Sequence, residues 1–224
     1  MGKKALWAAC VAVLMAGATA CGDSDDGAAG KPSSVPAAKL CDGTLGTSAA
    51  AALGRLGDTE RFQELDGTDG DGRPNAFSLA SVADDLRKKP VSSNTCAVYS
   101  ADLDTDTPMI DITFETVTTP PDPAKPARDG DLDRILFPVG AYASVGKGKG
   151  ASLYFACPRD LYGKDAGFVK AGMYIDEGMI DPGGTAGDRM AVLNAVSRGL
   201  AAELGCAAEA DLPAEVPEGH VLPR

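Results

Sequence analysis

The chain has 224 residues, of which 44% are hydrophobic and 24% charged, and its formal net charge at pH 7 is −11. Because nucleic-acid phosphates need clustered lysine and arginine, an acidic chain without a basic run is a poor candidate for binding nucleic acid. The only histidine, His220, lies near the C-terminus in a segment that we expect to be loose. We therefore predict no histidine-dependent catalysis, no metal site and no cofactor.

The first 21 residues have the pattern of a bacterial export signal. Two lysines at positions 3 and 4 precede an apolar run at 5–16, and the sequence ATAC follows at 18–21. The run is shorter than the about 20 apolar residues that a membrane-spanning helix needs. Small residues that end in a cysteine resemble the lipobox of bacterial lipoproteins. This resemblance implies that residues 1–20 are a signal peptide and that Cys21 carries a lipid.

Three further segments follow the signal peptide. Residues 21–39 are mostly Gly, Ser, Asp, Ala, Pro and Lys, a composition typical of a disordered tether. Apolar periodicity begins at Leu40-Cys41, and we expect a single domain at 40–206. Residues 207–224 are acidic and interrupted by prolines, which predicts a flexible acidic tail.

The first part of the domain has helical patterns. We expect helices at 47–56, capped by Thr47 or Ser48 and ended by Gly57, at 60–65, and at 79–88, capped by Ser78 and stopped by Pro90. Between the last two, 66–74 is rich in Asp and Gly. A calcium loop is the alternative there, but the register puts Gly67 at a ligand position, so an acidic turn is favoured.

From Cys96 the apolar pattern alternates, which is typical of strands. The expected strands are 96–101, 109–118, 135–145, 151–157 and 168–175. The proline-rich segment 119–131 is interpreted as a long hairpin connection, with a domain boundary as the alternative. Glycines at 146–150 predict a hairpin turn rather than a phosphate loop, because a strand and not a helix follows.

A last helix is expected from Thr185 or Ala186 to Leu204, with Gly205 as its C-terminal cap. The elements predict an α+β fold: an antiparallel sheet of about five strands with N- and C-terminal helices packed on it.

Four cysteines remain once Cys10 leaves with the signal and Cys21 is acylated. An even number in an exported chain predicts disulfides, with three possible connectivities. We favour the pairs Cys41–Cys96 and Cys157–Cys206, each of which joins a helix end to a strand. Since none of the four lies in a CxxC pair, they predict stabilising bridges rather than a zinc or redox site.

Four short motifs resemble small, mostly uncharacterised, cysteine-containing lipoproteins of high-GC Gram-positive bacteria. They are LCDGTL at 40–45, CAVY at 96–99, LYFACP at 153–158 and LAAELGC at 200–206. The resemblance covers about residues 40–206 and implies no activity or site residue.

No enzyme signature is found. The tryptophan, Trp7, belongs to the signal, and Tyr99, Tyr154, Phe155 and Tyr174 are interpreted as sheet packing rather than as a sugar-binding shelf. We expect a non-enzymatic binding or accessory module, held by its lipid on the outer face of the cytoplasmic membrane. Its partner would be an envelope component or another exported protein. The alternatives are a cell-envelope hydrolase that uses paired carboxylates and a purely structural surface protein.

Overall fold

The computed structural model describes residues 34–65, 75–122, 134–146, 150–163 and 165–221. The predicted signal peptide, Cys21, most of the tether, the acidic turn at 66–74 and residues 123–133 lie outside these ranges. Among the described residues, none of the helices has the length and hydrophobicity needed to cross a bilayer.

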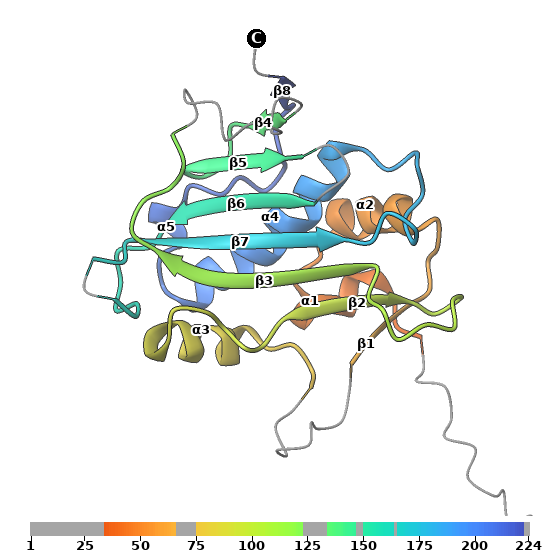
Figure 1. Cartoon of the computed structure of the whole chain (residues 1–224), viewed down its shortest axis with the longest axis horizontal. Coiled ribbons are helices and arrows are strands. Elements are labelled where there is room, and N and C mark those ends of the chain that lie inside the picture. The colour runs from red at the N-terminus through yellow and green to blue at the C-terminus, as the bar shows by residue number, and fades with distance from the viewer. Residues whose placement is uncertain (1–33, 66–74, 123–133, 147–149, 164, 222–224) are drawn as a thin grey trace, which may run out of the picture. The chain divides into compact units, whose positions relative to one another are not determined.

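One antiparallel sheet of eight strands organises the domain (Figure 1). Its order is β1-β2-β3-β7-β6-β5-β4-β8. The strands are β1 (Phe62–Glu64), β2 (Cys96–Ser100), β3 (Ile110–Val117), β4 (Ile135–Phe137), β5 (Tyr142–Val145), β6 (Ala151–Ala156), β7 (Phe168–Ile175) and β8 (His220–Val221). The α+β class and the antiparallel sheet are as predicted, but the expected number of about five strands is wrong.

The helices pack on one face of this sheet, and α2 and α4 lie behind it in Figure 1. They are η1 (Ala37–Lys39), α1 (Leu40–Gly43), α2 (Thr47–Gly57), α3 (Leu79–Lys88), α4 (Ala186–Glu203) and α5 (Ala207–Ala210). The core lies between helices and sheet. Five of the six phenylalanines are buried there: Phe62, Phe77, Phe114, Phe137 and Phe155. No described helix covers the other face.

Capping explains why two helices begin where the sequence predicts. The Ser78 hydroxyl accepts the Ser81 N–H at the start of α3. At the start of α4, Thr185 and Asp188 form a reciprocal capping box. Asp188 also pairs with Arg55 of α2, which ties the two helices together. Burial alone would raise the pKa of Asp188, but hydrogen bonds from Arg55 and Thr185 outweigh burial and hold the pKa below its ordinary value.

The glycines predicted at helix ends act differently. Gly205 follows α4 with φ 77°, as a C-terminal cap requires. After α2 the left-handed residue is Asp58, with φ 44°, and not Gly57. A Cβ on Gly57 would lie 2.8 Å from the Met109 methyl carbon, so a larger residue here would require the Met109 side chain to move.

The predicted short helix at 60–65 is wrong, because residues 62–64 form β1. Phe62 is fully buried and lies opposite Ser100 of β2. Three residues are too few for periodicity to separate strand from helix, so a partner distant in sequence decides.

The segment 135–145 forms two strands instead of one. β4 and β5 are joined by a turn that contains Gly140, with φ 58°.

The predicted hairpin between 109–118 and 135–145 does not form. β3 pairs along its whole length with β7, and β4 pairs with β5, so the sheet runs through both halves of the chain as one domain.

The fold extends beyond the predicted domain at both ends. Val35, assigned to the tether, forms a bridge with Phe62, and η1 follows it. Residues 207–221, assigned to a flexible tail, also pack: Ala210 is buried, and His220 lies opposite Leu136 in β8. The few apolar side chains between the acids and prolines of this segment are sufficient to anchor it.

The two disulfides have the favoured connectivity. Cys41–Cys96 and Cys157–Cys206 have Cα–Cα distances of 5.4 and 5.2 Å, and all four residues are fully buried. Cys41 does not begin a regular helix as expected. With Asp42 and Gly43 it forms a left-handed turn, at φ 50°, 60° and 70°.

Candidate functional site

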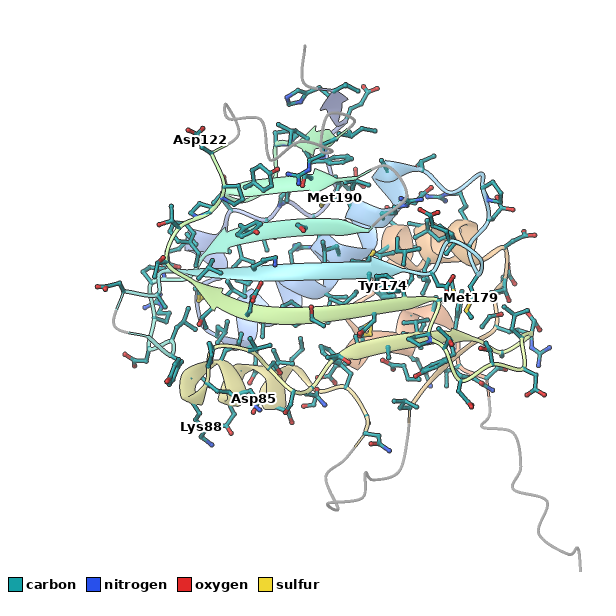
Figure 2. All side chains as sticks on the ribbon, viewed as in Figure 1. Asp85, Lys88, Asp122, Tyr174, Met179 and Met190 are labelled. Atoms are coloured by element: carbon teal, nitrogen blue, oxygen red, sulfur yellow. A yellow bond between two sulfur atoms is a disulfide. The ribbon has the colours of Figure 1, made fainter. Side chains whose placement is uncertain are left out.

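The uncovered sheet face carries most of the tyrosines. Side chains alternate along a strand, so the registers place Tyr99, Tyr142, Tyr154 and Tyr174 on this face. These are four of the five tyrosines in the chain, the fifth being Tyr162. Tyr174 is 61% exposed, and Figure 2 shows it near the C-terminal end of β7. Most of the phenylalanines thus lie in the core, and most of the tyrosines lie on the open face.

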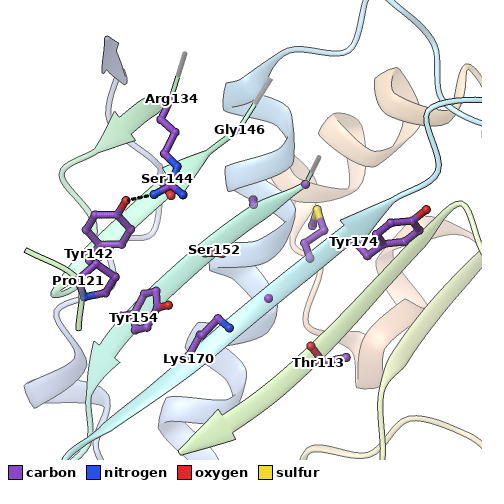
Figure 3. Close-up of a pocket in the computed structure, with 14 residues that line it drawn as sticks. Thr113, Pro121, Arg134, Tyr142, Ser144, Gly146, Ser152, Tyr154, Lys170 and Tyr174 are labelled. Carbon is purple, nitrogen blue, oxygen red and sulfur yellow. Dashed lines mark hydrogen bonds between the residues drawn. The ribbon is translucent and has the colours of Figure 1, made fainter. Parts of the chain in front are cut away.

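An open trough of about 660 Å³ lies on this face, over β3, β7, β6 and β5 (Figure 3). Its floor is one row of small residues across the four strands. Ser144 lies opposite Ser152, Ser152 opposite Gly172, and Gly172 opposite Thr113. We call these four residues the floor row. The floor is low because none of them has more than two side-chain heavy atoms beyond Cβ.

The adjacent row is taller and forms one wall of the trough. Tyr142 lies opposite Tyr154, Tyr154 opposite Lys170, and Lys170 opposite Glu115. We call these residues the wall row. The two tyrosine rings pack edge to face with centroids 5.6 Å apart. Arg134, which directly precedes β4, donates to the Tyr142 hydroxyl at 3.0 Å, as the dashed line in Figure 3 marks.

The wall row is electrostatically coupled. Partial burial acts to lower the pKa of Lys170, but the hydrogen bond to Glu115 together with the charges of Tyr154 and Glu115 outweighs burial and raises the pKa above its ordinary value. Burial raises the pKa of Tyr154, against the opposing effect of the Lys170 charge. At neutral pH the wall row therefore presents an ammonium group and a protonated phenol side by side.

Tyr174 forms the opposite side of the trough, with Asp111 beside it on β3. Burial raises the pKa of Asp111, and its Oδ1 is buried without a hydrogen-bond partner among the described residues. Tyr174 and the wall row are thus separated by the floor row, as Figure 3 shows.

A second hollow of about 950 Å³ lies between η1, α2 and β1. Small side chains line much of it, among them Ala37, Ala50 and Gly54. Its arginines already have acidic partners: Arg55 pairs with Asp188, and Arg61 pairs with Asp102. The trough has the richer chemistry, because it combines hydroxyls, aromatic rings and cations.

The Cys41–Cys96 bridge has an acidic neighbour. Glu64 Oε1 accepts the Cys41 N–H at 2.9 Å and lies 3.3 Å from Cys96 Sγ. Burial raises the pKa of Glu64, and the Cys41 N–H opposes this increase. The three residues bring potential metal ligands within 4.8 Å of one another. The ligand form of cysteine is the thiolate, however, and both sulfurs are held in the disulfide.

The structure brings together tyrosines that the sequence treats separately. Tyr99, Tyr154 and Tyr174 were interpreted as sheet packing, and they do lie on the sheet, but on its open face. The missed signal is the alternation itself, since each of these tyrosines follows a residue whose side chain points into the core. His220 lies exposed on β8, at the edge of the sheet, and does not line the trough.

In comparisons with known proteins, no family model, no curated protein and no solved structure matches this chain. The site must therefore be interpreted from its own residues.

Proposed function

We propose that this protein is a lipid-anchored, extracytoplasmic binding module and that its ligand occupies the trough. The observation that carries the proposal is that helices cover only one of the two sheet faces. One face is covered by helices, and the other leaves a concave surface of rings and hydroxyls open to solvent. Its volume falls in the range of small-molecule sites, about 300–1,000 Å³.

The trough favours binding over carboxylate hydrolysis. Paired-carboxylate glycosidases need acids about 5–9.5 Å apart. Two acids flank the trough on β3, Asp111 and Glu115, and they are four residues apart, which separates their Cα atoms by about 13 Å. Glu115 also pairs with Lys170, so its carboxylate already has a partner.

The trough also favours binding over a purely structural role. A sheet face with no ligand has no need of a row of small residues between taller ones. The floor hydroxyls of Thr113, Ser144 and Ser152 have no hydrogen-bond partner among the described residues. The Thr113 and Ser152 hydroxyls are accessible to a ligand, whereas Ser144 is only 5% exposed.

The anchor is tested by mass spectrometry and by the variant Cys21→Ser. We expect a diacylated cysteine at the mature N-terminus, and release of the variant from membranes into the soluble extracytoplasmic fraction. The control is Cys21 left intact with Tyr162→Ala, which should stay membrane-bound. An unmodified leader, or a variant that stays on membranes, would refute the anchor.

The binding site is tested with the exported Cys21→Ser chain and washed cell envelopes. We expect the chain to be retained by the envelopes, and the variant Ser152→Trp, which fills the trough from its floor, to lose retention at least tenfold. Tyr162→Ala is the matched control, because Tyr162 is a half-exposed tyrosine that does not line the trough. Equal retention of Ser152→Trp and the parent chain, with unchanged circular dichroism, would contradict the proposal.

A further inference from the structure

The residues that line the trough differ in charge from the chain as a whole. The chain has 32 acidic and 21 basic residues. Among the described residues that line the trough, Arg134 and Lys170 are cationic and none is acidic. Glu115 lies at the end of the wall row and pairs with Lys170, but it is outside the lining. The lining therefore carries two basic side chains and no acidic one on a chain of net charge −11, so anions are less disfavoured in the trough than elsewhere on the surface.

The floor row offers hydroxyl groups over the width of three strand-to-strand gaps, about 14 Å. A hydroxyl rotates and acts as donor or acceptor, so Ser144, Ser152 and Thr113 suit a ligand whose own groups do both. Sugar hydroxyls have this property. Gly172 between Ser152 and Thr113 leaves room for a ring to approach the backbone.

The trough also offers aromatic surface on both sides. Tyr142 and Tyr154 stand on one side of the floor and Tyr174 on the other. The face of an aromatic ring is electronegative and attracts the weakly positive C–H groups of a pyranose ring. Hydroxyls and C–H faces in one ligand are the chemistry of carbohydrate.

A protein partner fits this surface less well. Serine and lysine are depleted at protein–protein interfaces, whereas aromatic residues and arginine are enriched. Ser144 and Ser152 form part of the floor of the trough, and Lys170 stands in its wall. The polar floor thus favours a small, hydroxyl-rich ligand.

We infer that the trough binds an acidic saccharide, that is, pyranose rings that carry carboxylate or phosphate groups. The rings lie over the floor row between Tyr154 and Tyr174, and the acidic group faces the Lys170 ammonium. This inference rests on the proposed binding function and names its ligand class. The order of the wall row places the cation beside Tyr154, so one ligand residue meets ring and charge together.

The test uses isothermal titration calorimetry on the exported Cys21→Ser chain with four probes. They are tri-galacturonate, the same trisaccharide with its carboxylates reduced to alcohols, phosphorylated dextran and inorganic phosphate. We expect the acidic trisaccharide or the phosphorylated dextran to bind, and the uncharged trisaccharide to bind at least tenfold more weakly. Preference between the first and third probes distinguishes carboxylate from phosphate. Affinity should decrease as salt concentration rises.

Two pairs of matched variants test separate contributions to binding. The pair at Ser152 separates the effect of charge from that of side-chain size, and the pair at Tyr154 separates the effect of the ring from that of the hydroxyl. Ser152→Glu and Ser152→Gln place side chains of equal size on the floor, and the Glu variant should weaken binding about tenfold more than the Gln variant. Tyr154→Phe keeps the ring and should bind within about threefold of the parent chain, whereas Tyr154→Leu should lose about tenfold. Melting temperatures of all four variants check that each is folded.

Three results would overturn the inference. The uncharged trisaccharide could bind as tightly as the acidic one, which would remove the role of charge. Inorganic phosphate could compete fully while Tyr154→Leu has no effect, which would indicate a simple anion site. All probes could fail although envelope retention still depends on Ser152→Trp, which would refute the ligand class, favour a protein partner and leave the binding function standing. If retention itself is absent, the proposed function fails with the inference.

Discussion

Glu64 shows how one residue can have a cost that the sequence does not indicate. Its carboxylate accepts a hydrogen bond from the Cys41 N–H. Cys41 is the first residue of a left-handed turn, so a regular helix does not supply a partner for this N–H. Glu64 is also partly buried, and burial raises its pKa above its ordinary value of 4.5. The folded state therefore favours the protonated carboxyl, while the turn needs only a hydrogen-bond acceptor.

We predict that Glu64→Gln changes the pH dependence of stability. A raised folded-state pKa contributes stability that is present below the unfolded pKa and is lost as pH rises through the folded pKa. The parent chain should thus lose free energy of unfolding above about pH 4.5 relative to the variant. The glutamine oxygen still accepts the Cys41 N–H. Urea unfolding between pH 4 and 7 measures the difference.

The pKa of Asp188 is shifted in the opposite direction to that of Glu64, so Asp188 serves as an internal reference. Its pKa is held below its ordinary value by Arg55 and Thr185, so its contribution is lost only as pH falls through that depressed pKa. The two effects therefore occupy different pH ranges. A stability difference between Glu64→Gln and the parent that is constant from pH 4 to 7 would contradict the assignment to Glu64.

At the scale of elements, the C-terminal segment is the least expected part of the fold. The Asn194 side chain, 2% exposed on α4, donates to the Pro213 carbonyl at 2.8 Å. Ala210 is buried, and Leu212 and Val216 pack against the core. The segment thus covers α4 and adds β8 to the edge of the sheet.

We predict that deleting residues 207–224 destabilises the domain by about 2 kcal/mol or more. The Asn194 amide then loses its hydrogen bond to Pro213, which contributes about 1 kcal/mol, and the apolar surface that Ala210, Leu212 and Val216 cover is exposed to water. Chemical denaturation of the two chains measures the loss.

Deletion of residues 214–224 alone is the matched control, since it keeps α5 and the Pro213 acceptor. We expect most of the loss to come from residues 207–213. Equal stability of the two truncated chains would show that the Asn194–Pro213 hydrogen bond contributes nothing to the free energy of unfolding.

At the scale of the molecule, two disulfides hold separate parts of a single sheet domain. The Cys41–Cys96 and Cys157–Cys206 loops have sequence separations of 55 and 49 residues and do not overlap. In the chain-entropy model each closure contributes about 4 kcal/mol. Since a domain of this kind has a net stability of about 5–15 kcal/mol, the two bridges together represent much of it.

We predict that replacing either pair by alanines lowers the free energy of unfolding by about 4 kcal/mol, and that the two losses add. Urea unfolding of the parent chain, each pair variant and the combined variant forms a thermodynamic cycle. A loss near zero for one pair, or a combined loss equal to a single one, would contradict independent loop closures.

Local rules account for the parts of the fold that were predicted from sequence. Ser78 and Thr185 begin their helices because a side-chain oxygen satisfies a free N–H, and this depends on three or four neighbouring residues. Strand β7 was predicted with its observed bounds because its alternation spans eight residues. By contrast, β1 and β8 have three and two residues and exist only through their partners.

The sequence by itself determined the antiparallel α+β class and the main helices and strands, because periodicity and capping act over short distances, whereas it favoured two cysteine pairs without excluding the other connectivities. Only the tertiary structure decided the strand order, the docking of residues 207–221 and the trough. These features depend on which strands become neighbours, since a floor row of four residues from four strands exists only after pairing. The proposed ligand site is such a feature: each tyrosine is an ordinary strand residue until the open face brings them together.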